Sequence, residues 1–386
     1  RYEMAQMVAK AMAKNPTGAN KAELDRLAAE FRDELDALGV RVAELEKYAD
    51  KVIWQGKIEY TYKSARTDNI YDKGKTRVNQ DDWIFRFEPI MEVNDHWTLR
   101  SRIDAHVDLS RDTNSSFKLE RGWAQGNYDK LQIRVGRQPL YTNEDGIIWD
   151  TEYTGADVTV GSKWKFTAFG GRLKDGKVVG SQRNAGSWNG RQDDVSADER
   201  WNEATGRTAG AGTDPSSFWA INVQYDQGTG LYGGAGYYGI KDDDLRTTAY
   251  SKHGNKNKAK IWSVNAGYKF SPKAQLRGAF AKNTDADYEN NSWQAIFNYG
   301  DLYGGGNQST KKGQWAVWAG YKKLGSNTSL QAINWDDAFA GTKGVIAGAS
   351  WAPMDRVVFI AKYFKGKYIE GKGDAERLFG RVEFFY

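Results

Sequence analysis

The stretch WSVNAGYKF at residues 262–270 alternates in character from one residue to the next. Trp262, Val264, Ala266, Tyr268 and Phe270 are apolar or aromatic, and the four residues between them are polar or glycine. Because successive side chains of a β-strand point to opposite faces, this spacing predicts a strand with one apolar and one polar face. The aromatic residues stand near the two ends of the stretch, and smaller residues fill its middle.

The same period of two runs from Trp54 to the last residue, for instance in 54–63, 97–109, 315–321 and 357–363. The chain has 42 glycines and 13% aromatic residues but only 6 prolines, and its apolar fraction of 40% is low for a large soluble core. It contains no run of about 18 apolar residues, the length that a membrane-spanning helix requires. A transmembrane β-barrel fits both observations, because its strands need an apolar residue only at every second position.

A soluble β-sandwich would also alternate, but two features favour a barrel. Aromatic pairs bracket short aliphatic stretches, as in interfacial girdles: Trp54 with Tyr62, Trp219 with Tyr225, Trp262 with Phe270, and Trp315 with Tyr321. Tight turns also alternate with long polar loops, which is typical of outer-membrane barrels. The predicted turns are 93–96, 126–130, 161–163, 226–230, 271–273 and 352–355; the predicted loops are 64–80, 110–116, 139–153, 172–216, 241–257, 283–290, 324–342 and 365–374.

Seventeen segments could be strands, and a single-chain barrel with both ends on one side needs an even number. We assign 327–335 to a loop, since neither of its faces is consistently apolar. The prediction is therefore an all-β, antiparallel barrel of sixteen strands over residues 54–386. It requires the long connection 301–312 to lie on the side of the short turns.

The C-terminal segment RLFGRVEFFY (377–386) alternates up to the final aromatic residue. It resembles the last strand by which bacterial barrel proteins are delivered to the outer-membrane insertion machinery. The resemblance implies that Phe384 and Tyr386 form an assembly signal.

The first 53 residues have helical periodicity instead. Residues 1–15 form an amphipathic pattern that Pro16 and Gly18 end, and a charged segment follows with one narrow apolar seam. We predict that this seam is a coiled-coil stalk (19–53) that packs against copies of itself, with one stutter near Phe31. The alternative is a single helix lying on the barrel or plugging it. The seam residues are Leu24, Leu27, Phe31, Leu35, Leu38, Val42, Leu45, Ala49 and Val52.

The run RYEMA (Arg1 to Ala5) resembles the last helix of an S-layer homology (SLH) domain, so residues 1–18 are interpreted as the end of such a domain. No signal peptide precedes it, and we interpret the chain as a mature or truncated fragment. SLH-like helix, stalk, barrel and terminal aromatic together resemble the OmpM-like SLH porins of bacterial outer membranes. The resemblance implies a homotrimer in outer-membrane lipid, with a periplasmic stalk, that passes small hydrophilic solutes. It also implies tethering to peptidoglycan through residues N-terminal to Arg1.

The predicted lumen wall has a cluster of cationic residues. Arg86, Arg100, Arg102 and Arg134 fall on the polar face of consecutive strands, and Lys118 joins them. The loop 139–153 carries Glu144, Asp145, Asp150 and Glu152. If it folds into the lumen, its acids face the arginines across a constriction. The alternative is that the arginines are ordinary wall residues and the acids are solvated.

Several other classes of function lack support in the sequence. There is no cysteine for thiolate chemistry, and we expect no metal or cofactor. The net charge of +5 is spread among interleaved acids and bases, which does not favour nucleic acid. An outer-membrane enzyme is an alternative because His106 shares a face with Asp104 and Asp108, but no nucleophile stands beside it. Three adjacent acids at 242–244 could bind a cation, although such a loop is usually solvated. A closed barrel that serves only as a structural anchor is a further alternative.

Overall fold

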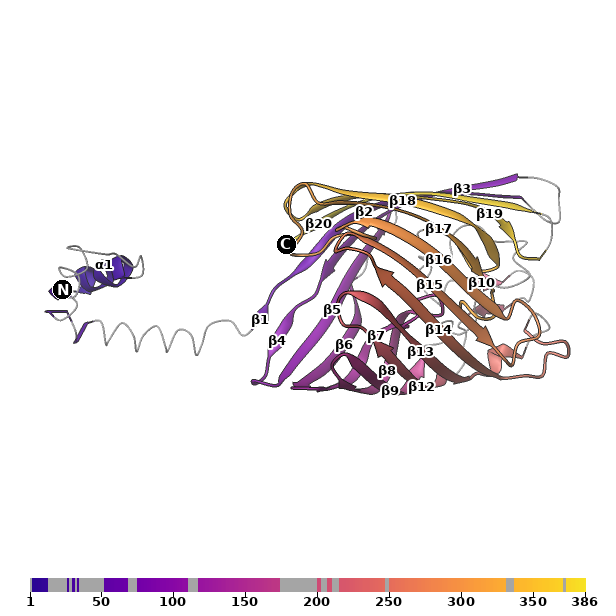
Figure 1. Ribbon diagram of the computed structural model, residues 1–386, viewed down its shortest axis with the longest axis horizontal. Helices are drawn as coiled ribbons and strands as arrows, with labels where there is room; N and C mark the ends of the chain where they lie inside the picture. Colours follow the sequence, from indigo (N-terminus) through magenta and orange to yellow (C-terminus); the bar gives the residue numbers. More distant parts are fainter. Residues whose placement is uncertain are drawn as a thin grey trace. The chain divides into compact units, whose positions relative to one another are not determined.

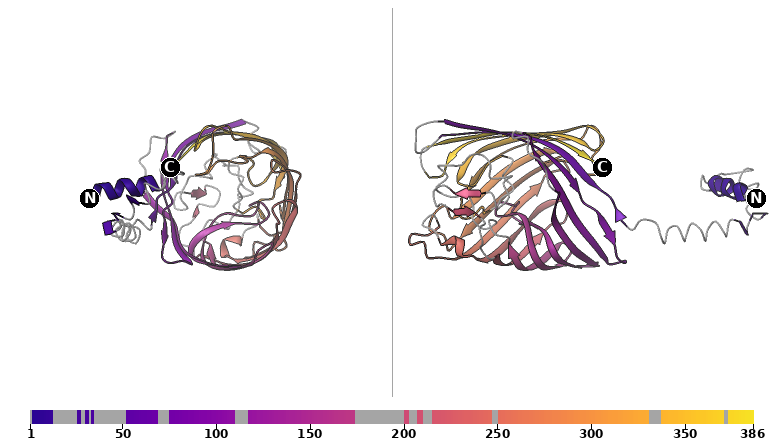
Figure 2. Two further views of the ribbon diagram at one scale, coloured as in Figure 1. Left: turned by 60° about the vertical axis from the view of Figure 1, so that its left-hand side comes forward. Right: turned by 180° about the vertical axis from the view of Figure 1, so that it is seen from behind.

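The structure is a computed structural model, and it describes residues 2–12, 26–27, 30–31, 33–34, 52–68, 75–109, 117–173, 200–202, 207–209, 215–246, 250–330, 337–370 and 373–386. The chain divides into two compact units, residues 1–53 and 54–386. The second unit is a closed antiparallel β-barrel (Figures 1 and 2). In the left view of Figure 2, its strands form a complete ring.

Sixteen long strands of the described residues make up the barrel. They are β2 (Gly56–Asp68), β3 (Lys75–Phe87), β5 (Trp97–Asp108), β6 (Phe117–Tyr128), β7 (Leu131–Tyr141), β8 (Asp150–Gly161), β9 (Trp164–Leu173), β12 (Ser216–Tyr225), β13 (Gly230–Lys241), β14 (Lys258–Lys269), β15 (Ala274–Asn283), β16 (Asn291–Gly300), β17 (Trp315–Leu324), β18 (Thr342–Met354), β19 (Val357–Tyr368) and β20 (Asp374–Phe385). Short elements complete the set: β1 (Val52–Ile53), β4 (Ile90–Glu92), the pair β10 (Arg200–Asn202) and β11 (Arg207–Ala209), and the 3-10 helix η3 (Asp243–Leu245).

The barrel closes because the first long strand pairs with the last. Lys57 to Thr67 of β2 lie opposite Phe385 to Ala375 of β20, and β9 pairs with β12 across the long intervening connection. Among the described residues, each long strand therefore pairs with a neighbour on both sides along at least part of its length, and the sheet has no free edge strand. The predicted antiparallel barrel of sixteen strands is confirmed.

The outer wall is apolar and the inner wall is packed, as the alternation predicts. In β14, Trp262, Val264 and Tyr268 are exposed on the outside, while Ile261 and Ser263 are buried on the inside. The outward aromatic side chains form two rows. In the row near the long connections, the paired rings are Trp219 with Tyr237, Trp262 with Phe280, and Trp293 with Tyr321. In the row near the short turns, they are Trp164 with Tyr225, Tyr268 with Phe270, and Tyr299 with Trp315. Two such rows on one wall match the girdles of a membrane barrel.

The two ends of the barrel differ in their connections. Tight turns join most hairpins at one end, and longer segments join them at the other. The connection 301–314 lies at the short-turn end, as the strand count requires. The predicted loops 64–80 and 365–374 are shorter than expected. The ladder between β2 and β3 continues to Asp68 opposite Lys75. The ladder between β19 and β20 likewise continues to Lys367 opposite Asp374. Residues 327–330 form no strand, and 331–335 lie outside the described residues.

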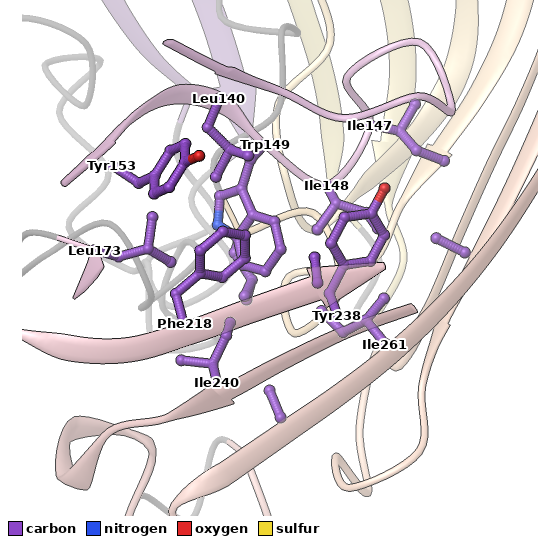
Figure 3. Packing of buried hydrophobic residues seen from close by; sticks show 14 of the residues in the cluster. Leu140, Ile147, Ile148, Trp149, Tyr153, Leu173, Phe218, Tyr238, Ile240 and Ile261 are labelled. Atoms are coloured by element: carbon purple, nitrogen blue, oxygen red, sulfur yellow. The ribbon is translucent and has the colours of Figure 1, made fainter. Parts of the chain in front are cut away.

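The lumen contains two apolar clusters that cover one side of the wall. In the first, Ile147, Ile148 and Trp149 from the β7–β8 connection pack on Phe218 and Tyr238 of β12 and β13 (Figure 3). The second packs residues of the connections 301–314 and 325–341 over strands β16 to β20, and it includes Leu302, Trp318, Phe339 and Phe364. Inserted segments therefore occupy the lumen beside the apolar half of the wall.

The N-terminal unit contains the helix α1 (Tyr2–Met12), as predicted. Phe31 is buried against Ala5 and Val8 of this helix, and Leu27 packs on the same cluster. Two of the predicted seam residues thus contact α1 in this structure. Leu24, Leu35, Leu38, Val42, Leu45 and Ala49 lie outside the described residues, and Val52 is in β1. The coiled-coil stalk stays a prediction. Among the described helices, none has the length and apolar character needed to cross a membrane.

Candidate channel and its constriction

The charged half of the inner wall comprises β20, β2, β3, β5, β6 and β7. Register and alternation place the following cationic residues on its inner face: Lys57, Lys63, Arg86, Arg100, Arg102, Lys118, Arg121, Arg134, Arg377 and Arg381. The acids on the same face are fewer, and they include Glu59, Asp82, Asp104 and Glu383. The wall opposite, on β12 to β19, presents mainly uncharged side chains, both apolar ones such as Ile261 and polar ones such as Asn222. A water-filled passage would therefore run along the charged half.

One charge cluster joins the first and last strands. Lys57 Nζ lies 2.5 Å from Glu59 Oε2 and donates to Glu383 Oε1 at 2.6 Å. Arg381 Nη2 lies 3.5 Å from the other oxygen of Glu59, and its Nε donates to Thr61. Burial of a charge is tolerated when it is paired and hydrogen-bonded. These contacts connect side chains of β2 and β20 at the closure of the barrel.

Arg86 and Arg102 share a single carboxylate. Arg86 donates through Nε and Nη2 to the two oxygens of Asp104, each at 2.9 Å. Arg102 donates to Asp104 Oδ2 through Nε at 2.9 Å and Nη2 at 2.6 Å. The side chain of Asp104 is only 1% exposed. The two arginines are thus fixed by the acid between them, and one positive charge of the group remains uncompensated by it.

Arg134 is held in a similar way on the next strands. Its guanidinium donates to Asp157 of β8, with Nε at 3.0 Å from Oδ1 and Nη2 at 2.8 Å from Oδ2. Tyr153 donates its hydroxyl to the same carboxylate at 2.5 Å and accepts from Gln138. Asp157 follows the loop and is a partner that the sequence analysis did not identify.

The predicted constriction segment does enter the lumen, but Glu144 turns to the wall away from the arginines. Tyr238 and Ser263, on β13 and β14, donate to Glu144 Oε2 at 2.9 and 2.8 Å. The residue is completely buried. Burial raises the pKa of this loop carboxyl, and hydrogen bonds such as that from Ser263 oppose the rise.

Asp145 also lies toward the apolar side of the barrel. Gln294 of β16 donates to its Oδ2 at 2.8 Å, Arg277 Nε of β15 is 3.4 Å from the same oxygen, and Tyr141 donates to Oδ1. Asp145 has a positive φ of 61°, which turns the segment sharply at this point.

The structure therefore brings Arg86 and Arg102 together, but it directs Glu144 and Asp145 to other partners. Of the loop acids, Glu152 approaches the arginines, 3.8 Å from Arg121 and 3.4 Å from Arg137.

A second inserted segment, 301–314, reaches Arg277 from the short-turn end. The Arg277 guanidinium lies 3.7 Å from the ring centroid of Tyr303, a cation–π distance. The backbone N–H of Gly306 donates to Glu383, and Gln308 donates to the carbonyl of Gly56. A Cβ at Gly306 would lie 2.4 Å from Val358, so glycine permits this close approach. The connection that the strand count treated as an exception is a packed segment in the barrel mouth.

The last residue contacts the neighbouring strands rather than projecting freely. The Tyr386 hydroxyl donates to the Arg86 carbonyl at 2.8 Å, and its ring lies 6.2 Å from Phe85 and 6.1 Å from Phe87. Phe384 is exposed on the outer wall. These placements neither require nor oppose the predicted assembly signal, which stays a prediction.

No group of acids and histidines that could hold a metal ion occurs within the described ranges. His106 Nε2 is 3.8 Å from Asp104 Oδ2, and that carboxylate already binds Arg86 and Arg102. In the acidic stretch at 242–244, Asp243 pairs with Arg246 at 2.9 Å and Asp242 accepts from Ser216. These contacts assign Asp104, Asp242 and Asp243 to local structure.

Arg277, Tyr303 and Trp149 hold the inserted segments in the lumen, although no motif in the sequence singled them out. Arg277 is the one cation in the inward phase of β15, and this single signal could have identified it. The packing of Tyr303 and Trp149 depends on how two connections turn, which the local pattern does not determine.

Comparison with known proteins finds similarity in structure only. No protein-family model matches the sequence, and no curated protein matches it. A mutant of the porin of Rh. blastica has a TM-score of 0.47 at 11% identity, over 86% of this chain and 100% of that one. A structure described as "Asymmetric conductivity of engineered proteins" has a TM-score of 0.49 at 10% identity, over 87% and 100% of the two chains. A closed barrel of sixteen antiparallel strands is an architecture that fits a porin.

Proposed function

We propose that this protein is an outer-membrane porin that allows passive diffusion of small hydrophilic solutes and ions. The observation that carries the proposal is the opposite character of the two faces of one closed wall. Large apolar side chains such as Phe166 and Ile221 are exposed on the outside, while Arg86, Arg102 and Arg134 line part of the inside. A lipid-facing outer wall around a charged lumen is the arrangement of a diffusion channel.

Liposome swelling tests the proposal directly. Purified protein reconstituted into liposomes should let small sugars enter, at rates that fall with solute size. Liposomes that contain the folded barrel and swell no faster than empty ones would contradict it. That result would instead favour the structural anchor, for which the two inserted segments in the lumen are the supporting observation.

The oligomeric state that we propose is a homotrimer held in part by the N-terminal stalk. The support is the narrow apolar seam of the charged segment 20–53, whose heptad spacing suits packing against similar helices, although Leu27 and Phe31 also contact α1. Native mass measurement in mild detergent should give three copies. A monomer with an intact N-terminal region would contradict this proposal.

Tethering to peptidoglycan is proposed on the resemblance of Arg1 to Ala5 to an SLH domain end. In that family the SLH domain holds the wall-binding residues. The natural protein should therefore sediment with purified peptidoglycan, and the fragment 54–386 should not. Equal sedimentation of both would overturn the assignment.

A further inference from the structure

Three nitrogen atoms on the inner wall of β5 and β6 have no hydrogen-bond acceptor within the part of the chain that the structure describes. They are Nε of Arg100, Nε of Arg121 and Nε1 of Trp123, and each is shielded from solvent. The register places Arg100 directly opposite Trp123, and Arg102 opposite Arg121. Side chains at such positions of one face are neighbours. We call Arg100, Arg121 and Trp123 the donor patch.

The donor patch lies in a region of excess positive charge. Asp104 is already bound by Arg86 and Arg102. Within the described ranges, Arg100 has no carboxylate at ion-pair distance, and Arg121 reaches Glu152 only through Nη2 at 3.8 Å. The acids that were expected to face this wall, Glu144 and Asp145, bind the opposite side of the lumen.

Next to the donor patch, two neighbouring positions of the inner face are glycines and carry no side chain. Gly136 lies opposite Trp123, and Gly155 lies opposite Gly136 on the following strand. A Cβ at Gly136 would meet the carbonyl oxygen of Gly122 at 2.5 Å, and the residue has a φ of 131°, so the position favours glycine. No side chain from these two positions competes for the Trp123 indole or the Arg100 guanidinium.

A shielded N–H without an acceptor is unfavourable, and either water or a solute can supply the acceptor. Water would satisfy the donors and leave the charge of Arg100 uncompensated. An oxyanion would satisfy both, because its oxygens match the planar fork of donors on a guanidinium. Several such donors on one wall therefore favour carboxylate or phosphate groups over chloride, which has no fixed geometry to match.

Building on the proposed porin function, we propose that the channel selects for anions and that the donor patch is its binding step for small oxyanions. The patch attracts an anion into the passage along the charged wall and holds it through two guanidinium groups and one indole N–H. Release is expected toward Gly136 and Gly155, where the inner face carries no side chain.

Reversal potentials in planar bilayers under a potassium chloride gradient test the selectivity. The wild-type pore should favour chloride, and the double variant R100Q/R121Q should shift the reversal potential toward that of potassium. The matched control K252Q/K273Q removes two exposed charges from connections outside the strands and should leave the potential unchanged. A wild-type pore that favours potassium, or equal potentials in R100Q/R121Q and wild type, would overturn the inference.

Inorganic phosphate tests the binding step separately. Added to the chloride solution, it should reduce the chloride current of the wild type in a saturable way, and R100Q/R121Q should lose this block. The conservative variant R100K/R121K keeps both charges but lacks the planar fork, so it should stay anion-selective with weaker block. A pore that conducts but shows no saturable block would refute the oxyanion site, whereas a protein that forms no pore would refute the proposed function instead.

Discussion

The substitution Trp149→Ala should release the inserted segment 142–149 from the lumen wall without unfolding the barrel. The Trp149 ring is fully buried and meets Phe218 and Tyr238 edge to face, at centroid distances of 5.6 and 5.7 Å. Truncation of a buried Trp to Ala costs about 3–5 kcal/mol. Here that cost falls on docking of the segment, because the substitution leaves the backbone bond between Trp149 and Thr142 in place and the β7–β8 ladder begins after it, at Asp150.

The effect on the docking equilibrium follows from this cost. Each 1.4 kcal/mol changes an equilibrium constant about tenfold, so the undocked fraction should rise by roughly a hundredfold or more. The chain has no cysteine, which allows one reporter thiol to be introduced at Ile147, a residue with no exposure in the docked state. Labelling of Ile147→Cys by a water-soluble thiol reagent then measures undocking directly.

We expect W149A to raise the labelling rate of the Ile147→Cys protein by about a hundredfold or more. The control substitution Trp351→Ala removes the same type of side chain from the outer wall, where Trp351 is 54% exposed, and should leave the rate unchanged. If W149A accelerates labelling less than about tenfold in a barrel of native circular dichroism, the packing in Figure 3 does not hold the segment in place.

Three further outcomes are expected. Tyr386→Ser should lower the amount of protein in the outer membrane while changing the stability of the folded barrel by less than about 1.5 kcal/mol, since the ring is only partly buried; normal membrane levels in cells would contradict the assembly signal. Arg277→Met should weaken the hold on Asp145 and increase current noise in single-channel records, and noise equal to wild type would show that this contact does not restrain the segment. The Lys312 backbone N–H holds the pKa of Asp355 below its usual range, so this carboxylate contributes stability above its unfolded pKa of about 4 and loses it as pH falls through the lower folded value. Asp355→Asn should therefore lower the melting temperature at pH 7, and by less as the pH falls through the folded pKa; an equal effect across this range would refute this role.

The barrel was predictable from the sequence because its pattern is local. Alternation in stretches such as 262–270 needs only the geometry of one strand, and the aromatic ends indicate where the wall meets the interface. Strand ends were less predictable. Beyond the lipid-facing band both faces of a hairpin meet water, so β2 and β3 lose the apolar signal while their backbone ladder continues to Asp68 and Lys75.

The charged residues of the inner wall were predictable, but their partners were not. Alternate side chains of a strand face the lumen, and this alternation predicts that Arg86, Arg102 and Arg134 point inward. The direction of Glu144 depends on the turn at Asp145 and on the packing of Trp149 against distant strands, which are tertiary effects. Likewise, periodicity placed Phe31 on an apolar seam, but only the structure identifies α1 as one of its neighbours.

The central claim is that this barrel encloses a continuous aqueous pathway, and single-channel recording in planar bilayers tests it most directly. We expect discrete current steps with a linear current–voltage relation at low voltage and a conductance that rises with salt concentration. Absence of such steps, from protein shown to be inserted and folded, would contradict the account.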